Sequence, residues 1–240
     1  MSFWNKLFGS NGSSPLQPPQ PSAKVPAVNA APLPATPPSA TPSPGSLVGS
    51  IFKGRVRNVE DGLKALFVDI GVEKTAFLHY WDIMPTSFDS SVEVVEREAL
   101  RQNRPRITQK DIPRLYPPGC EIIVQVTKES SGTKGPRVTT NIVLPGCHLV
   151  LLPNSDQSGI SRKIENTEER QRLKIILREL SIPDGMGVIM RTTGAGQQKS
   201  FFVSDLDFLL GRWREIQDKI KTQPPASCVF RPSALIQTGT

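Results

Sequence analysis

The chain has 240 residues, and its 29 lysines and arginines outnumber its 22 aspartates and glutamates, so it carries a formal net charge of +7 and polyanions are the first partners to consider. No stretch approaches the roughly 18 apolar residues of a membrane span, and the start lacks the apolar run of a secretory signal. We therefore expect no transmembrane segment and a cytoplasmic location. The three cysteines form no C-x-x-C pair and neither histidine stands at ligand spacing, which argues against a disulfide framework or a zinc site.

Residues 1–46 differ in composition from the rest of the chain. Of the 23 prolines, 11 fall between Pro15 and Pro44, among Ala, Ser, Thr and Gln. Such a segment cannot bury enough apolar surface to offset the entropy lost on ordering, so we expect a disordered tail. It opens with the sequence MSFWNKLFG, whose aromatic residues can share one face of a helical turn. This nonapeptide is either a docking peptide or a frayed end.

The next segment, 47–145, alternates apolar and polar residues as strands do. Residues 47–59 and 63–70 predict two antiparallel strands joined by a turn at 60–62. In the second strand Leu66, Val68 and Ile70 face one side, which we take as the core, and Phe67 faces the other. The following strand places Phe77 outward in the same way.

Two exposed rings on neighbouring strands would form a platform on which nucleobases stack. Each stacked base contributes about 1–3 kcal/mol, whatever its identity. Lys53, Arg55, Arg57 and Lys74 lie close enough in sequence to contact phosphates. The alternation alone equally allows Phe67 and Phe77 to be core residues.

The motifs GSIFKGRV (49–56), ALFVDIG (65–71) and AFLH (76–79) resemble the opening strands of an S1-type RNA-binding domain, a five-stranded OB barrel. The resemblance implies that His79 lies on the RNA face. The closing strands would be residues 119–128 and 137–144. Between the two halves, residues 82–118 form a polar insertion without an assigned place. Its basic residues are either a solvated face or an extension of the RNA groove; they are Arg101, Arg104, Arg106 and Lys110.

Residues 146–225 predict a small α/β domain. A buried strand at 149–153 is followed by Asn166 and Glu169 at capping-box spacing, and by a helix with apolar residues at positions i, i+3, i+4 and i+7. A strand at 186–190 and a second amphipathic helix over about 202–220 complete the domain. We expect no regular structure in residues 226–240.

The turn RTTGAG (191–196) offers the groups that a terminal phosphate needs. Arg191 can donate two parallel hydrogen bonds, Thr192 adds a hydroxyl, and Gly194 and Gly196 allow backbone N–H groups to approach. Taken alone, the pattern also fits an ordinary glycine-rich turn with a surface arginine.

The ordered motifs KGPRVTTNIVLPG (134–146), HLVLLPN (148–154), GISRKIE (159–165) and PDGMGVIMRTTGAG (183–196) resemble the ribonuclease E/G family, in the segment called the 5′ sensor that follows its S1 domain. The resemblance covers about residues 48–225. It implies that the 5′-monophosphate of RNA is bound by Arg191 and Thr192, with Gly146 and Val150 lining the pocket. It also implies RNA contacts along the barrel and beside it; these are Phe67, Phe77, His79, Lys53, Arg55, Lys128, Lys134, Arg162 and Lys163.

This family cleaves single-stranded RNA by Mg²⁺-assisted hydrolysis, and its catalytic carboxylates lie in a domain beyond the sensor. The resemblance fades after residue 225, so we expect no cofactor in this chain, Mg²⁺ only in the missing catalytic domain, and no cleavage by the chain alone. The expected architecture is mixed α+β, a five-stranded OB/S1-type barrel followed by an α/β 5′-sensor domain. The expected function is binding of single-stranded, preferably 5′-monophosphorylated RNA as the N-terminal part of an endoribonuclease in RNA processing and decay, with a separately encoded catalytic domain or other subunits as further partners. The alternative is a stand-alone, non-catalytic RNA-binding regulator.

Overall fold

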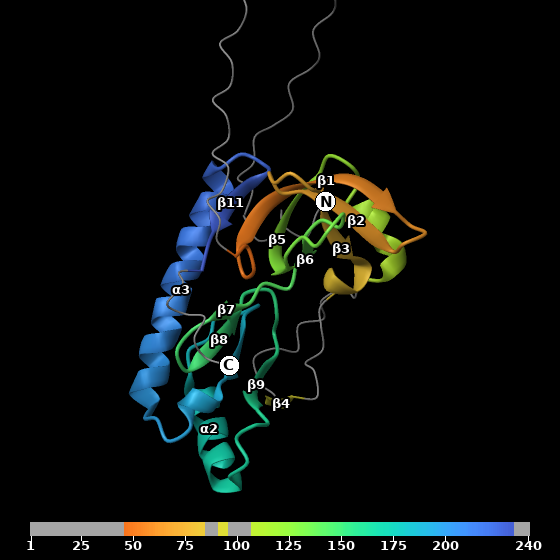
Figure 1. Ribbon diagram of the computed structural model, residues 1–240. Coiled ribbons are helices and arrows are strands. Elements are labelled where there is room, and N and C mark those ends of the chain that lie inside the picture. The colour runs from red at the N-terminus through yellow and green to blue at the C-terminus, as the bar shows by residue number, and fades with distance from the viewer. Residues whose placement is uncertain (1–45, 85–90, 96–106, 233–240) are drawn as a thin grey trace, which may run out of the picture. The chain divides into compact units, whose positions relative to one another are not determined.

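Five strands close a barrel in the computed structural model, which describes residues 46–84, 91–95 and 107–232 (Figure 1). The strands are β1 (Ile51–Glu60), β2 (Ala65–Asp69), β3 (Ala76–His79), β5 (Glu121–Lys128) and β6 (Arg137–Thr139). Their order is β1-β2-β3-β6-β5, and β5 pairs with β1 to close the sheet. Strands β3 and β6 run parallel, whereas the other neighbours are antiparallel. The predicted OB-type barrel is confirmed.

The barrel interior is built by the alternation of side chains along its strands. Leu66, Val68, Ala76 and Leu78 are completely buried, and Ile70 is nearly so. Burying apolar surface stabilises a fold by about 25 cal/mol per Å². This core therefore fixes which side chains of β2 and β3 remain on the outer surface.

A further strand adds to the barrel sheet where the sequence predicted an irregular tail. Strand β11 (Ser227–Phe230) runs antiparallel to the start of β1, with Ile51 opposite Phe230. Gly71 allows this addition, because a Cβ there would lie 2.1 Å from the carbonyl oxygen of Ala226, and its φ is +79°. A four-residue run whose partner lies near the other end of the folded chain gives no periodic signal, so the strand could not be predicted.

The insertion at 82–118 divides between two parts of the structure. Residues 107–116 include the 3-10 helix η4 (Gln109–Asp111) and the short helix α1 (Ile112–Leu115), and Ile112 and Tyr116 join the barrel core. Strand β4 (Val92–Val95) instead pairs with β9 (Ser158–Ser161) of the second sheet. Arg101, Arg104 and Arg106 lie outside the described residues, and Lys110 lies in η4.

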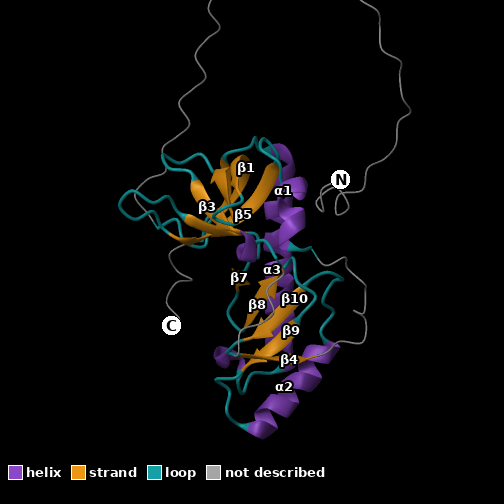
Figure 2. Ribbon diagram, turned by 90° about the vertical axis from the view of Figure 1, so that its right-hand side faces the viewer, coloured by secondary structure: helices purple, strands orange, loops and turns teal. Residues whose placement is uncertain are grey.

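The second sheet has five strands in the order β4-β9-β10-β8-β7 (Figure 2). Its other members are β7 (Leu144–Pro145), β8 (Leu149–Leu152), β9 (Ser158–Ser161) and β10 (Gly187–Met190). Only β9 and β10 are parallel neighbours. Helix α2 (Thr167–Glu179) packs against β9, and helix α3 (Lys199–Thr222) packs against β8. A small α/β unit therefore follows the barrel, as predicted.

The two long helices follow their predicted apolar patterns. Asn166 caps α2, since its side-chain oxygen accepts a hydrogen bond from the N–H of Glu169 at 3.0 Å. Helix α3 buries a stripe at alternating spacings of four and three residues, made of Phe202, Leu206, Leu209, Trp213, Ile216 and Ile220. Within the described ranges, no helix combines the length and apolar character needed to cross a membrane.

Candidate functional site

A row of rings lies on the outer face of β2 and β3. Phe67 and Phe77 stand directly opposite each other in this antiparallel pair, half-buried, with ring centroids 5.9 Å apart in an edge-to-face arrangement. The imidazole of His79, two residues further along β3, lies 6.3 Å from the Phe77 ring. The three predicted ring residues therefore share one face and remain partly accessible to solvent.

Ion pairs hold arginines at two borders of this row. Arg57 donates two hydrogen bonds to Asp69, at 2.6 and 3.1 Å. Burial would raise the pKa of Asp69, but the hydrogen bond from the Gly71 N–H and the contact with Arg57 outweigh it and hold that pKa below its usual range. On the other border Arg137, the parallel partner of Phe77, pairs with Asp82 at 2.9 Å.

The predicted basic residues of the barrel take different positions. Arg55 is exposed and stands opposite Asp69, hence on the face of Phe67. Lys53 is only 9% exposed, because its ammonium group donates to the carbonyl of Gln223 at 3.1 Å and pairs with Glu121 at 3.2 Å. The ammonium group of Lys53 is therefore engaged within the protein, and sequence spacing could not reveal these contacts.

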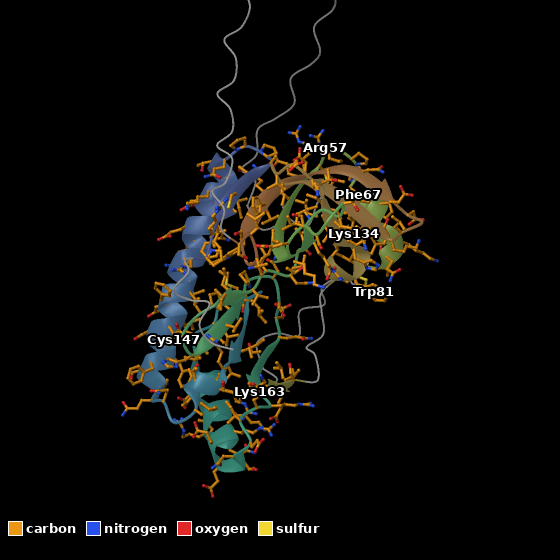
Figure 3. All side chains as sticks on the ribbon, viewed as in Figure 1. Arg57, Phe67, Trp81, Lys134, Cys147 and Lys163 are labelled. Carbon is orange, nitrogen blue, oxygen red and sulfur yellow. The ribbon has the colours of Figure 1, made fainter. Side chains whose placement is uncertain are left out.

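Lys128 and Lys134 are both exposed near the closing strands. Lys128 is the cross-strand partner of Arg137 on β6, beside a bulge. Lys134 ends a tight turn, in which its main chain bridges to Ser131. Figure 3 labels Arg57, Phe67 and Lys134 on the barrel. The structure thus brings cations from β1, β5, β6 and this turn to the same barrel as the ring row.

The glycine-rich turn at 191–196 contacts the turn at 146–149. The guanidinium of Arg191 donates to the carbonyl of Gly146 at 2.6 Å. Thr193 donates from its hydroxyl to the carbonyl of Cys147, also at 2.6 Å. Thr192, which begins the 3-10 helix η5 (Thr192–Gly194), is exposed beside Arg191. Arg191 and Gly146 are therefore neighbours although 45 residues separate them.

Asp205 on α3 organises the 146–149 turn and was not among the predicted site residues. Its carboxylate accepts hydrogen bonds from the main-chain N–H groups of Cys147 at 3.1 Å and of His148 and Leu149 at 2.8 Å each. A Cβ on Gly146 would lie 2.7 Å from both carboxylate oxygens, so this position has room only for glycine. The contacts of Asp205 are with backbone groups at least 56 residues away, so no side-chain motif marks them.

Glu169 fixes the other end of the glycine-rich turn. Its carboxylate accepts a hydrogen bond from the Gly196 N–H at 2.8 Å and two from Arg172, at 2.6 and 2.8 Å. The hydrogen bond from Arg172 is the main cause that lowers the pKa of Glu169 to about 2. The N–H groups of Gly194 and Gly196 are thus occupied within the protein, by Arg191 and Glu169 respectively. Arg191 and Thr192 remain the candidate phosphate ligands of this turn.

The remaining predicted residues lie on the second sheet. Val150 is half-buried on β8, opposite Pro145 and Ile189. Arg162 and Lys163 are exposed directly after β9, and Figure 3 labels Lys163 there. In the part of the chain that the structure describes, no group of three His, Cys, Asp or Glu side chains could hold a metal ion.

This chain is similar in sequence to known ribonucleases. Residues 143–239 match the model of the Ribonuclease E/G family. Ribonuclease G of Haemophilus influenzae is 40% identical over 191 residues, which are 80% of this chain and 37% of that protein. Ribonuclease G of Escherichia coli is 39% identical over the same length and shares. Ribonuclease E of Haemophilus influenzae is 38% identical over 188 residues, 78% of this chain and 19% of that protein.

This chain spans little more than a third of the length of the Ribonuclease G relatives that it matches. The matched stretch contains the 146–149 turn and the glycine-rich turn, and the identities extend over four-fifths of the chain. Residues 143–239 thus match the Ribonuclease E/G family, and four-fifths of the chain is similar in sequence to ribonucleases G.

Proposed function

We propose that this chain binds single-stranded RNA on the barrel and the 5′-monophosphate of that RNA at Arg191 and Thr192, as part of a ribonuclease E/G-type endoribonuclease that acts in RNA processing and decay. The observation that carries the proposal is the ring row of Phe67, Phe77 and His79, which is partly open to solvent and bordered by arginines. Aromatic faces bind bases of any sequence, and cations beside them bind the backbone.

Support for end recognition comes from the contact between the two turns. The guanidinium of Arg191 donates to the carbonyl of Gly146, and Thr192, the next residue in the chain, is exposed. A guanidinium held in this way can present parallel N–H donors to a phosphate monoester, which a lysine cannot reproduce. We place Gly146 and Val150 beside the terminal nucleotide, and Arg162, Lys163, Arg55, Lys128 and Lys134 along the RNA backbone. We leave out Lys53, whose ammonium group is already engaged.

One binding experiment tests both halves of the proposal. The affinity of the purified chain is measured for two single-stranded RNAs of roughly ten nucleotides, identical except for a 5′-monophosphate or a 5′-hydroxyl. Arg191→Ala should lower the affinity for the monophosphorylated RNA about tenfold and leave the hydroxyl RNA nearly unaffected. Arg178→Ala, which removes an exposed arginine from α2, serves as the matched charge control.

Phe67→Ala should weaken the binding of both RNAs by about 1–3 kcal/mol, because it removes a stacking ring. Equal losses on the two RNAs for Arg191→Ala would show that this residue is a general backbone contact. Unchanged RNA affinity for Phe67→Ala, or a large fall in its unfolding temperature, would show that the ring serves the barrel and would contradict the proposed surface.

A further inference from the structure

The indole of Trp81 is an exposed aromatic group that none of the assignments above uses. Its residue lies in the 3-10 helix η2 (Tyr80–Asp82), directly after β3, and is 60% exposed. A large apolar side chain in water makes no favourable packing contribution, and Trp is among the residues that most often dominate binding surfaces. Trp81 lies two residues after His79, the last residue of the ring row.

Trp81 continues the outward side of β3. From Ala76 to Trp81, residues alternate between buried and accessible, with Tyr80 completely buried on the inner side. The accessible residues are Phe77, His79 and Trp81. The main-chain N–H of Trp81 donates to Nδ1 of His79 at 3.2 Å, so the backbone of Trp81 contacts the imidazole. Figure 3 labels Trp81 on the same barrel as Phe67 and Lys134.

The turn that carries Trp81 is fixed on both sides. The Tyr80 ring is anchored in the barrel core. The carbonyl of Asp82 accepts hydrogen bonds from the Thr139 hydroxyl at 2.9 Å and the Thr140 N–H at 3.0 Å, while its carboxylate pairs with Arg137. The backbone of Trp81 is thus held before any ligand arrives. A preorganised aromatic side chain loses less entropy on binding than one on a mobile loop.

We propose that Trp81 stacks on a nucleobase of the bound RNA, extending the ring row by one base beyond Phe67, Phe77 and His79; this inference rests on the proposed function. A base is favoured over an apolar protein partner because Trp81 follows the accessible residues Phe77 and His79 at every second position of the chain and because Arg137, beside Phe77, pairs with the adjoining Asp82. Aromatic groups interleaved with cations match a strand whose bases alternate with phosphates. The indole has the largest π-face of the protein side chains and accepts any base.

The affinity for a 5′-hydroxyl oligouridylate of roughly ten nucleotides tests this role. Trp81→Ala should lower the affinity about 5- to 100-fold, and Trp81→Phe, which keeps a ring, should lower it less. Phe208→Ala is the matched control, since Phe208 is 53% exposed on α3 and lies away from the ring row in sequence and element. It should bind this RNA like the unmodified chain.

Fluorescence provides a second readout that does not depend on affinity. Trp213 is buried, so in a Trp4→Phe background Trp81 is the accessible indole among the described residues. The oligouridylate should quench its emission, and Trp81→Phe should abolish that quenching. Normal affinity of Trp81→Ala together with weakened binding by Phe67→Ala would overturn the role of Trp81 and leave the proposed function standing. Normal affinity of both variants would overturn both, and an unquenched indole would overturn the stacking alone.

Discussion

Glu169 shows how one residue can serve two local structures, one through its main chain and one through its side chain. Its main-chain N–H completes the cap on α2, whereas its carboxylate receives Arg172 and the Gly196 N–H. The sequence pattern Asn-x-x-Glu predicts the cap but not the second role. The reason is that a capping box returns the carboxylate to its own helix, and here the carboxylate is used by a loop 27 residues away.

Substituting Glu169 by glutamine should make stability depend less on pH. The pKa of Glu169 is lowered from 4.5 to about 2 in the folded chain, so its contribution is complete above about pH 4.5 and is lost as the pH falls toward 2. At pH 7 we expect Glu169→Gln to lower the free energy of unfolding by about 1–2 kcal/mol, since solvent screens Arg172, whose side chain is 40% exposed.

The measurement is urea unfolding of both chains from pH 7 to pH 3. The difference between them should stay constant down to about pH 5 and then shrink. A difference that grew on acidification would contradict the assigned hydrogen bonds. Glu168→Gln, which changes an exposed neighbour in the same helical turn, should show no such trend.

At the scale of elements, the carboxylate of Asp205 on α3 holds the main chain of the 146–149 turn. The Asp205 carboxylate accepts hydrogen bonds from three N–H groups of this turn. Carbonyl groups of the same turn accept hydrogen bonds from Arg191 and Thr193. Asp205→Ala should therefore lower the free energy of unfolding by about 2–3 kcal/mol, because hydrogen bonds to a charged group are lost and donors are left unpaired.

If the proposed function is right, Asp205→Ala should also weaken binding of 5′-monophosphorylated RNA more than binding of 5′-hydroxyl RNA. Asp207→Ala removes an equal charge from an exposed position two residues along α3 and should change neither quantity. If both variants behaved alike, net charge rather than the turn would explain the result.

The elements with local signals could be predicted from the sequence. The alternation of apolar and polar residues predicted β2 and β3 with their core residues, and the helical spacing of apolar residues predicted α3. The elements without such signals could not. β4 and β11 have four residues each, and their pairing partners are remote in sequence. In the candidate site, residue types and motifs indicated Arg191 and the rings, whereas the backbone contacts of Asp205 and the internal contacts of Lys53 depend on tertiary structure alone.

At the scale of the whole molecule, the chain leaves the barrel after β6, builds the second sheet and returns to β1 through β11. The barrel sheet therefore includes one strand from the other end of the described chain. Removing residues 227–240 should lower the free energy of unfolding by about 2–3 kcal/mol, because the buried Val229 and the strand pairing with β1 are lost. A chain ending at Pro232 retains β11 and should unfold like the full chain in the same urea titration.

The pairing of Ile51 with Phe230 also places the two ends of the described chain at one corner of the barrel. A Cβ on Gly49 would lie 3.2 Å from the Pro232 ring, so these flanking segments are in contact as well. A short peptide bridge could therefore join residue 232 to residue 46, and new termini could be opened in the exposed turn at 61–64. Such a circularly permuted chain would keep every described strand intact, and a group attached at residue 46 would lie beside one attached at residue 232.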